Sequence, residues 1–237
     1  FQNTRVNFRL LKIYKIFLGS LFAALTACGG GGGSAGTTNG GSSGGSTGVS
    51  AAKVVEVGAS ATSLRSADTD GITISAMVKD AANNAVTGQA VSFVASSGVL
   101  RSVASVTGAD GRATALLTAG NDRSNRIITV TVKAGSVEGN VVVPVDGTML
   151  SVAGSSSLLL GASTTYAVTL KDSGGNAIAA LPITVKSALG NTVTPAQSTT
   201  DNAGATSFTY VASRSGDDVI TVTGAGVVQT QTVNVSS

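Results

Sequence analysis

After about residue 50 the chain consists of short runs in which apolar and polar residues alternate. Residues 72–78 place Ile, Ile, Ala and Val at every second position, and residues 141–145 do the same with Val. A period of two puts the apolar side chains on one face of a strand, as a half-buried strand requires. No stretch of helical length in this part carries an apolar stripe at helical spacing. The pattern therefore predicts an all-β region.

The second half of this region repeats the first. Residues 78–86 match residues 170–178 at an offset of 92, and Gly111 matches Gly204 with one residue of slip. Further matches at the offset of 92 are Val91 and Phe93 with Ile183 and Val185, and Ile127–Thr131 with Val219–Thr223. Ordered matches of this kind indicate two copies of one structural unit. A unit of about 90 residues with many short strands predicts a sandwich of two packed sheets.

The turn residues of the two copies match as well as the strands do. The order is a strand followed by Lys-Asp-x-x-x-Asn-x-Val/Ile, then Val-x-Phe in the first copy, then Thr-x-x-x-Gly-x-Ala-Thr, then a strand rich in Thr and Val. This order resembles the bacterial immunoglobulin-like domain of the intimin/invasin type (group 1). The second copy departs from it at residues 200–204 and at Pro182. The resemblance implies two tandem immunoglobulin-like β-sandwiches, at residues 51–146 and 147–237, of a kind that stacks into rods and displays an adhesive tip.

The N-terminal segment has the layout of an export signal. Residues 1–15 carry four cations and no acidic residue, and residues 16–25 are mostly apolar. A cationic start, a short apolar run and small residues at a cut site define such a signal. Leu25, Thr26 and Ala27 precede Cys28 and together resemble a bacterial lipobox. The resemblance implies a signal peptide at residues 1–27, lipidation of Cys28 and a membrane anchor; the alternative is an ordinary signal in which the Cys occurs by chance.

Residues 28–50 follow the predicted cleavage site and are almost entirely Gly, Ser, Thr and Ala. A segment of this composition cannot bury apolar surface, so we expect a flexible tether with an r.m.s. span of roughly 25 Å. Gly29 stands where Asp would favour retention in the inner membrane of many Gram-negative bacteria. The expected location is therefore the cell envelope, as an outer-membrane lipoprotein that faces the periplasm or the outside.

Composition excludes several function classes. The chain has no His and one Cys, so the commonest general base and Cys-based zinc sites are missing. From Cys28 onward eleven cations face twelve acidic residues, a net charge of −1. A near-neutral protein without a basic stripe is not expected to bind nucleic acid. We predict no cofactor, and a protein or carbohydrate as the possible surface ligand.

Two motifs that match in the tether, or across its end, do not predict catalysis. Residues 32–36, 40–44 and 44–48 fit G-x-S-x-G, but a nucleophile elbow needs a strand, a helix and a His partner. Ser50 and Lys53 fit S-x-x-K, but residues three apart on a strand point to opposite faces. We therefore expect no catalytic residue and no enzyme activity.

Acidic residues beside turns are the remaining candidates for a functional or structural site. Asp68 and Asp70, and likewise Asp217 and Asp218, are weak candidates for a cation site, although acidic residues between strands usually belong to turns. We expect no other metal site. The repeated residues predicted to shape turns are Asp80, Asn84 and Gly111 in the first copy and Asp172, Asn176 and Gly204 in the second.

The predicted function is the display of the two modules at the cell envelope. We expect a non-enzymatic envelope lipoprotein whose two modules serve as a spacer or as adhesion-type interaction domains. The alternative is the stalk of a longer protein whose enzymatic or ligand-binding domain lies beyond residue 237. A hydrolase would need a nucleophile and base that the sequence lacks. A carbohydrate-binding sandwich usually stacks sugars on aromatic residues, which are few here.

Overall fold

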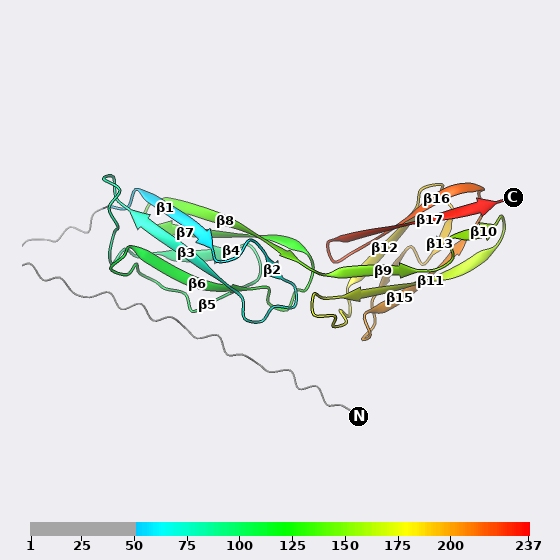
Figure 1. Cartoon of the computed structure of the whole chain (residues 1–237), viewed down its shortest axis with the longest axis horizontal. Coiled ribbons are helices and arrows are strands. Elements are labelled where there is room, and N and C mark those ends of the chain that lie inside the picture. Colours follow the sequence, from blue (N-terminus) through cyan, green and yellow to red (C-terminus); the bar gives the residue numbers. More distant parts are fainter. Residues whose placement is uncertain (1–50) are drawn as a thin grey trace, which may run out of the picture. The chain divides into compact units, whose positions relative to one another are not determined.

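A computed structural model describes residues 51–237 of the protein. Every regular element in this part is a β-strand (Figure 1), so the prediction of an all-β region with two sandwiches is confirmed. Within the described residues no helix is long and apolar enough to cross a membrane. The predicted signal peptide, lipobox and tether lie outside the described residues.

The first sandwich packs two antiparallel-rich sheets against each other. One sheet has the order β1-β3-β6-β5 and the other has the order β2-β8-β7-β4. The strands are β1 (Val54–Ala59), β2 (Leu64–Arg65), β3 (Ile72–Lys79), β4 (Ser92–Ala95), β5 (Val99–Arg101), β6 (Arg112–Thr118), β7 (Arg126–Ala134) and β8 (Val137–Asp146).

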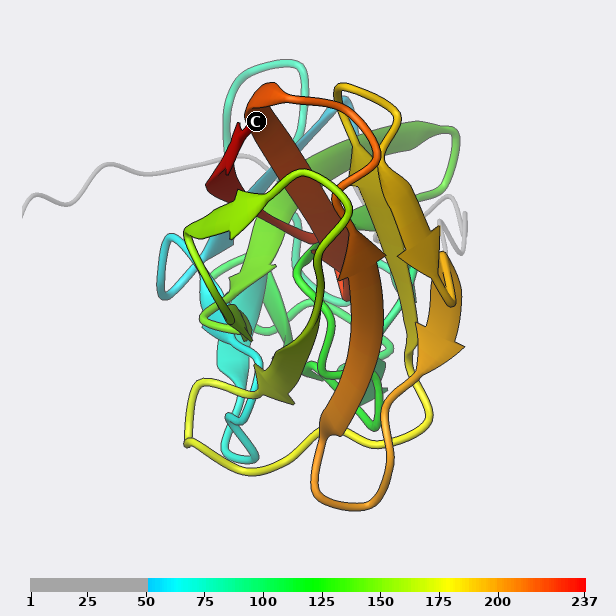
Figure 2. The same ribbon diagram turned by 90° about the vertical axis from the view of Figure 1, so that its right-hand side faces the viewer.

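The second sandwich repeats this topology and adds one strand. Its sheets have the orders β13-β15-β11-β9 and β10-β17-β16-β12-β14. The strands are β9 (Met149–Ala153), β10 (Ser157–Leu159), β11 (Ser163–Lys171), β12 (Pro182–Ser187), β13 (Thr192–Thr194), β14 (Gln197–Thr199), β15 (Ala205–Val211), β16 (Gly216–Gly224) and β17 (Val227–Ser236). In Figure 2 the end of this sandwich that carries the C-terminus faces the viewer.

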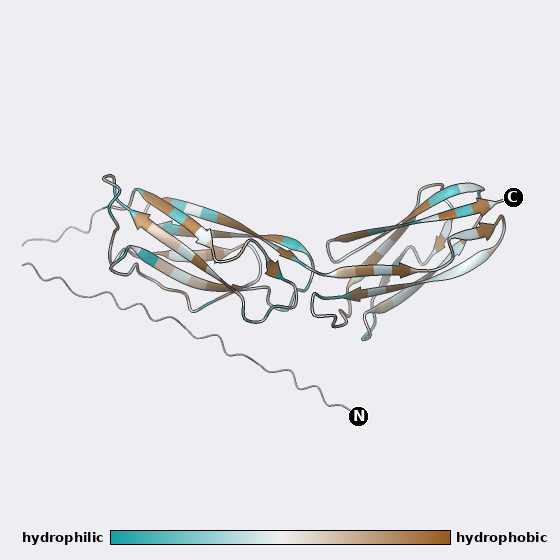
Figure 3. Cartoon of the chain, in the orientation of Figure 1, coloured by the Kyte–Doolittle hydropathy of each residue, from teal (hydrophilic) through white to brown (hydrophobic). Residues whose placement is uncertain are grey.

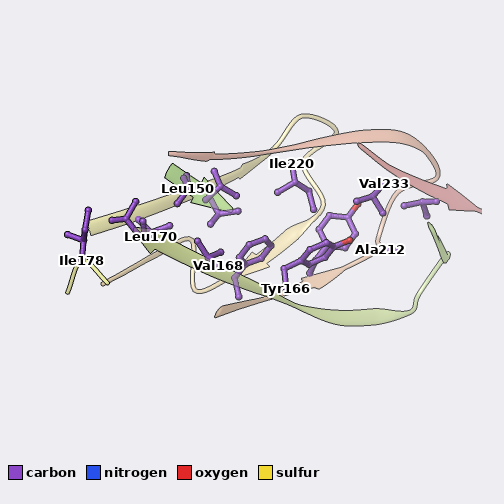
Figure 4. Packing of buried hydrophobic residues seen from close by; sticks show 14 residues of the cluster. Leu150, Tyr166, Val168, Leu170, Ile178, Ala212, Ile220 and Val233 are labelled. Atoms are coloured by element: carbon purple, nitrogen blue, oxygen red, sulfur yellow. The ribbon is translucent and has the colours of Figure 1, made fainter. Parts of the chain in front are cut away.

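The alternation seen in the sequence fills the two cores. In β3 the residues at 72, 74, 76 and 78 are buried and those between them are more exposed, and brown and paler segments alternate along many strands in Figure 3. The buried residues of the first core are Val, Ile, Leu and Ala, and the partly buried Phe93 packs against them. The second also contains rings (Figure 4): Tyr166 stacks on Phe208 with ring centroids 5.1 Å apart and meets Tyr210 edge-on. Each core buries the inward faces of both its sheets.

Strand register corrects one of the sequence matches. The hairpin β7–β8 turns between Ala134 and Val137, and the hairpin β16–β17 turns between Gly224 and Val227. The two hairpins therefore correspond at an offset of 90, and the match of residues 127–131 with 219–223 at 92 is wrong by two residues. The reason is physical: a Thr/Val alternation of period two matches itself again after a shift of two.

Short polar contacts link loops of the two sandwiches, which belong to one compact unit. The backbone N–H of Ser173 donates to Ser66 Oγ, and Ser173 Oγ accepts from the backbone N–H of Ala67, both at 2.9 Å. The backbone N–H of Asn125 donates to the carbonyl of Ala225 at 2.8 Å. Gly147, between β8 and β9, has a φ of +89°, which favours glycine there.

Candidate functional site

The residues proposed for lipidation, Leu25, Thr26, Ala27 and Cys28, lie outside the described residues. The other candidates fall within the two sandwiches, so their surroundings can be given. They divide into turn residues that occur in both copies, acidic residues that were considered for cation binding, and a buried polar cluster that occurs in the second copy alone.

The repeated Asp residues hold the turn after β3 and β11. Asp80 Oδ1 accepts hydrogen bonds of 2.9 Å from the backbone N–H groups two and four residues later, and Asn84 Nδ2 donates to Asp80 Oδ2 at 3.3 Å. Asp172 makes the same two backbone contacts at 2.9 Å, and Asn176 Nδ2 donates to its carboxylate. A side chain that accepts from nearby backbone in this way shapes a turn.

The two repeated glycines allow a close approach of backbone. Gly111 has a φ of +72° and Gly204 a φ of +70°. A Cβ at Gly111 would lie 2.8 Å from Ala85 Cβ, and one at Gly204 would lie 2.5 Å from the carbonyl oxygen of Leu170. Both the conformation and the space therefore require glycine.

The acidic pairs do not form a cage for a cation within residues 51–237. No group of three His, Cys, Asp or Glu side chains gathers there. Asp68 Oδ1 accepts from the backbone N–H of Asp70 at 2.9 Å, which is a turn contact. Asp217 and Asp218 are neighbours on β16, so their side chains point to opposite faces. Asp217 is exposed and Asp218 is fully buried.

Asp218 is the centre of a polar cluster that the sequence analysis did not identify. Its Oδ2 accepts from Ser187 Oγ at 2.6 Å, from Asn191 Nδ2 at 2.8 Å and from the Tyr210 hydroxyl at 2.8 Å. Its Oδ1 accepts from the backbone N–H of Leu189 at 2.9 Å. A buried carboxylate is tolerated when donors of this kind replace its hydration.

The cluster changes the acidity of two of its members. Burial by itself raises the pKa of Asp218, but the hydrogen bonds from Ser187, Leu189, Asn191 and Tyr210 outweigh it and lower the pKa from 3.8 to about 2. Burial raises the pKa of Tyr210, and its hydrogen bond to the Asp218 carboxylate raises it further. The pair is therefore an ionised carboxylate and a neutral phenol at neutral pH.

The donors around Asp218 suit a structural latch rather than a reaction. Asn191 Oδ1 in turn accepts from the backbone N–H groups of Ser213 at 2.9 Å and Arg214 at 2.7 Å. The cluster thus joins the β12–β13 and β15–β16 loops to β16. A signal was available in the sequence, since Tyr210 lies at an inward position of its strand in the alternation.

Comparisons with known proteins agree with this architecture. Residues 55–145 match the family model described as "Bacterial Ig-like domain (group 1)". No curated protein matches the chain. Among solved structures, the Yersinia pseudotuberculosis adhesin InvE is similar with a TM-score of 0.51 and 17% identity, over 77% of this chain and 59% of that one.

Two further solved structures are similar at lower TM-scores. Yersinia pseudotuberculosis InvD has a TM-score of 0.36 and 25% identity, over 76% of this chain and 57% of that one. Invasin, described as a bacterial integrin-binding protein, has a TM-score of 0.40 and 18% identity, over 78% of this chain and 40% of that one. The chain thus spans well under two thirds of the length of these three structures. Residues 55–145 are thus similar to the bacterial immunoglobulin-like domain of group 1, and a second sandwich of closely related topology follows them in the same chain.

Proposed function

We propose that the protein is a cell-envelope display module: two immunoglobulin-like domains, at residues 51–146 and 147–237, that serve as a spacer or as adhesion-type interaction domains. The observation that carries this proposal is the family match of residues 55–145 together with the repetition of the same sandwich. The likeness to the InvE adhesin supports the fold on which the proposal is built.

The proposed anchor is a lipid on Cys28. The support is the sequence Leu25-Thr26-Ala27-Cys28 at the end of an apolar run, followed by a Gly/Ser-rich stretch. Several acyl chains on one residue would bind a membrane stably, whereas a single chain binds only marginally. The protein would then reach from the outer membrane through a tether to its folded modules.

We further propose that the chain works by binding and presentation and not by catalysis. Its repeated polar residues shape turns, and the carboxylate of Asp218 already accepts four hydrogen bonds from its own fold. A catalytic base needs a free lone pair within reach of a substrate. The lack of His in the sequence supports the same proposal.

The first experiment is expression in a Gram-negative host beside a Cys28→Ala variant. We expect the parent protein in the membrane fraction, with a mass that fits cleavage before Cys28 plus acyl chains. The variant should be absent from that fraction. Equal solubility and the same simple cleavage for both proteins would contradict the anchor and leave secreted modules.

A second candidate is the stalk of a longer protein whose working domain follows residue 237. It is supported by the tandem repetition of one sandwich, which is an arrangement suited to a stalk. Sequencing the gene downstream of the codon for Ser237 tests it: a reading frame that continues into a further domain supports the stalk, and a stop codon contradicts it.

A further inference from the structure

A polar hollow opens on the first sandwich beside the ends of β5 and β6. Its cavity volume is about 240 Å³, and its lining includes Asp68, Thr69, Arg101, Asn121 and Arg123. These residues come from the β2–β3 loop, from the last position of β5 and from the β6–β7 loop. Two arginine residues therefore line one small cavity.

The second sandwich lacks the loops that make this hollow. The β2–β3 loop covers residues 66–71, whereas the β10–β11 loop covers 160–162. The β6–β7 loop covers residues 119–125, whereas the β15–β16 loop covers 212–215. Each loop of the first sandwich is three residues longer, so the hollow is an addition to the shared fold.

The cation at the end of β5 is likewise absent from the second sandwich. Arg101 pairs with Leu116 on β6, and the corresponding pair is Thr194 with Thr209 on β15. The loop contacts to the second sandwich use Ser66, Ala67 and Asn125 rather than Arg101. Neither the common fold nor those contacts therefore explains an arginine at position 101.

Some polar groups of the lining are held by hydrogen bonds within the described part of the protein, and others have no such partner there. Asp68 Oδ1 is held by the N–H groups of Asp70 and Gly71, and Arg123 Nη1 donates to the carbonyl of Ser66 at 2.8 Å. Within residues 51–237 the guanidinium of Arg101 has no hydrogen bond or ion pair to another residue. Its five donors are therefore available to a ligand.

A second acidic residue, in the β6–β7 loop, is already engaged. Asp122, in the same loop as Arg123, accepts from Ser124 and lies 3.4 Å from the guanidinium of Arg126. The hollow itself carries two cations and one carboxylate, which leaves a positive balance. This favours an anionic group on the ligand, in a fork geometry that suits a carboxylate.

We propose that this hollow binds an acidic sugar residue, with Arg101 and Arg123 on its carboxylate and Asp68, Thr69 and Asn121 on its hydroxyl groups. The free oxygen of Asp68 accepts from a hydroxyl, and the amide of Asn121 both donates and accepts. The volume is below the roughly 300–1,000 Å³ of sites for drug-sized molecules, so it suits one sugar ring. The inference goes beyond the display role by assigning the first sandwich a ligand class.

The test is NMR titration of the ¹⁵N-labelled Cys28→Ala chain with glucuronate, acetate and glucose. Removing Cys28 makes the result independent of the proposed anchor. We expect glucuronate to shift the amides of Thr69, Asn121 and their neighbours, acetate to bind more weakly, and glucose to leave them unchanged. The absence of shifts with glucuronate would overturn the site.

Two variants separate the hollow from general surface charge. Arg101→Gln should weaken glucuronate binding about tenfold, because it removes charge-assisted hydrogen bonds. Arg112→Gln is the matched control: it is an exposed arginine on β6 of the same sandwich and should leave binding unchanged. Equal weakening by both variants would overturn the assignment to the hollow. Equal affinity for acetate and glucuronate would overturn the proposal of a sugar ligand and would point to a carboxylate of a protein.

Discussion

The same interior position is apolar in the first sandwich and charged in the second. Ile128 on β7 faces Val143 on β8, and Asp218 on β16 faces Val233 on β17 in the equivalent register. Both Ile128 and Asp218 are fully buried. One fold thus accepts an alkyl group and a carboxylate at one place.

The residues around this position also differ between the two sandwiches. Leu117 on β6 corresponds to Tyr210 on β15, as their pairings with β3 and β11 show. The β4–β5 loop covers residues 96–98, and the β12–β13 loop covers 188–191. That loop is one residue longer and contains Asn191, so the second sandwich supplies the donors that the carboxylate needs.

The difference shows two ways to close the same end of a sandwich. In the first, Ile128 and Leu117 fill space, and a Cβ at Gly98 would lie 3.0 Å from Ile128 Cδ1. In the second, directional bonds tie two loops to a strand. An apolar core tolerates exchange of similar volumes, whereas a buried charge depends on every partner.

The largest expected effect comes from placing the charge where its partners are missing. Ile128→Asp should destabilise the first sandwich by about 5 kcal/mol, because a carboxylate would be buried beside Leu117 without donors. Amide hydrogen exchange in β3 and β7 measures this loss. Ile127→Asp is the control, since Ile127 is 60% exposed and its substitution should cost little. Similar losses for the two variants would contradict the comparison.

Removing the charge from the second sandwich should cost less. Asp218→Ala leaves the donors of Ser187, Asn191 and Tyr210 without their acceptor, and we expect a loss of about 3 kcal/mol. Tyrosine fluorescence follows this sandwich, because Tyr166 and Tyr210 both lie in it. Asp217→Ala, on the exposed neighbour, should change the unfolding midpoint much less.

Acid should weaken the second sandwich through Asp218. An unfolded Asp titrates near 3.8 and the folded one near 2, so the stabilisation is complete above pH 3.8 and is lost as the pH falls towards 2. The expected loss is about 2 kcal/mol. Guanidinium unfolding between pH 5 and pH 2 measures it, and Asp218→Ala should show a flatter dependence.

The first sandwich should respond less to the same change. Burial raises the pKa of Asp122, but hydrogen bonds from Ser124 and the charge of Arg126 outweigh it and lower the pKa overall. Asp122 is exposed, so solvent screens its contribution. If acid destabilised the first sandwich as much as the second, Asp218 would not be the main cause of the acid sensitivity.

The smallest expected effect tests what the two sandwiches share. Asp80→Ala and Asp172→Ala each remove an acceptor for two backbone N–H groups, and each should cost about 1 kcal/mol. Thermal unfolding monitored by hydrogen exchange measures both. Lys171→Ala, next to Asp172 and exposed, serves as the control. Unequal losses would mean that the turns are not equivalent supports.

Alternation was enough to predict strands at residues 72–78 and 141–145, and repetition pointed to the shared turns. Ile74 and Val78 occupy the inward face that a period of two assigns to them, and both are fully buried. The Asp80 and Asp172 turns were visible because each depends on residues within four positions. Local patterns carry this part of the fold because the interactions themselves are local.

The polar cluster and the hollow could not be predicted in the same way. Asp218 receives its donors from Asn191 and Tyr210, which other strands and loops bring to it. In the sequence Asp217 and Asp218 formed one candidate; the alternation along the strand separates their faces but does not show which donors Asp218 meets. The hollow depends on loop lengths, which the near-constant offset between the copies concealed.

In both sandwiches a strand near the beginning runs parallel to the last strand and pairs with it. β10 pairs with β17 over three residues, and β2 pairs with β8 over two. A pull on the two ends of a sandwich drags such strands in opposite directions along their length, so their hydrogen bonds must shear together. Resistance to force then depends on the rate of unfolding rather than on equilibrium stability. Because β2 and β8 pair over two residues and β10 and β17 over three, the first sandwich should unfold at a lower force than the second. Single-molecule pulling would record the order of unfolding.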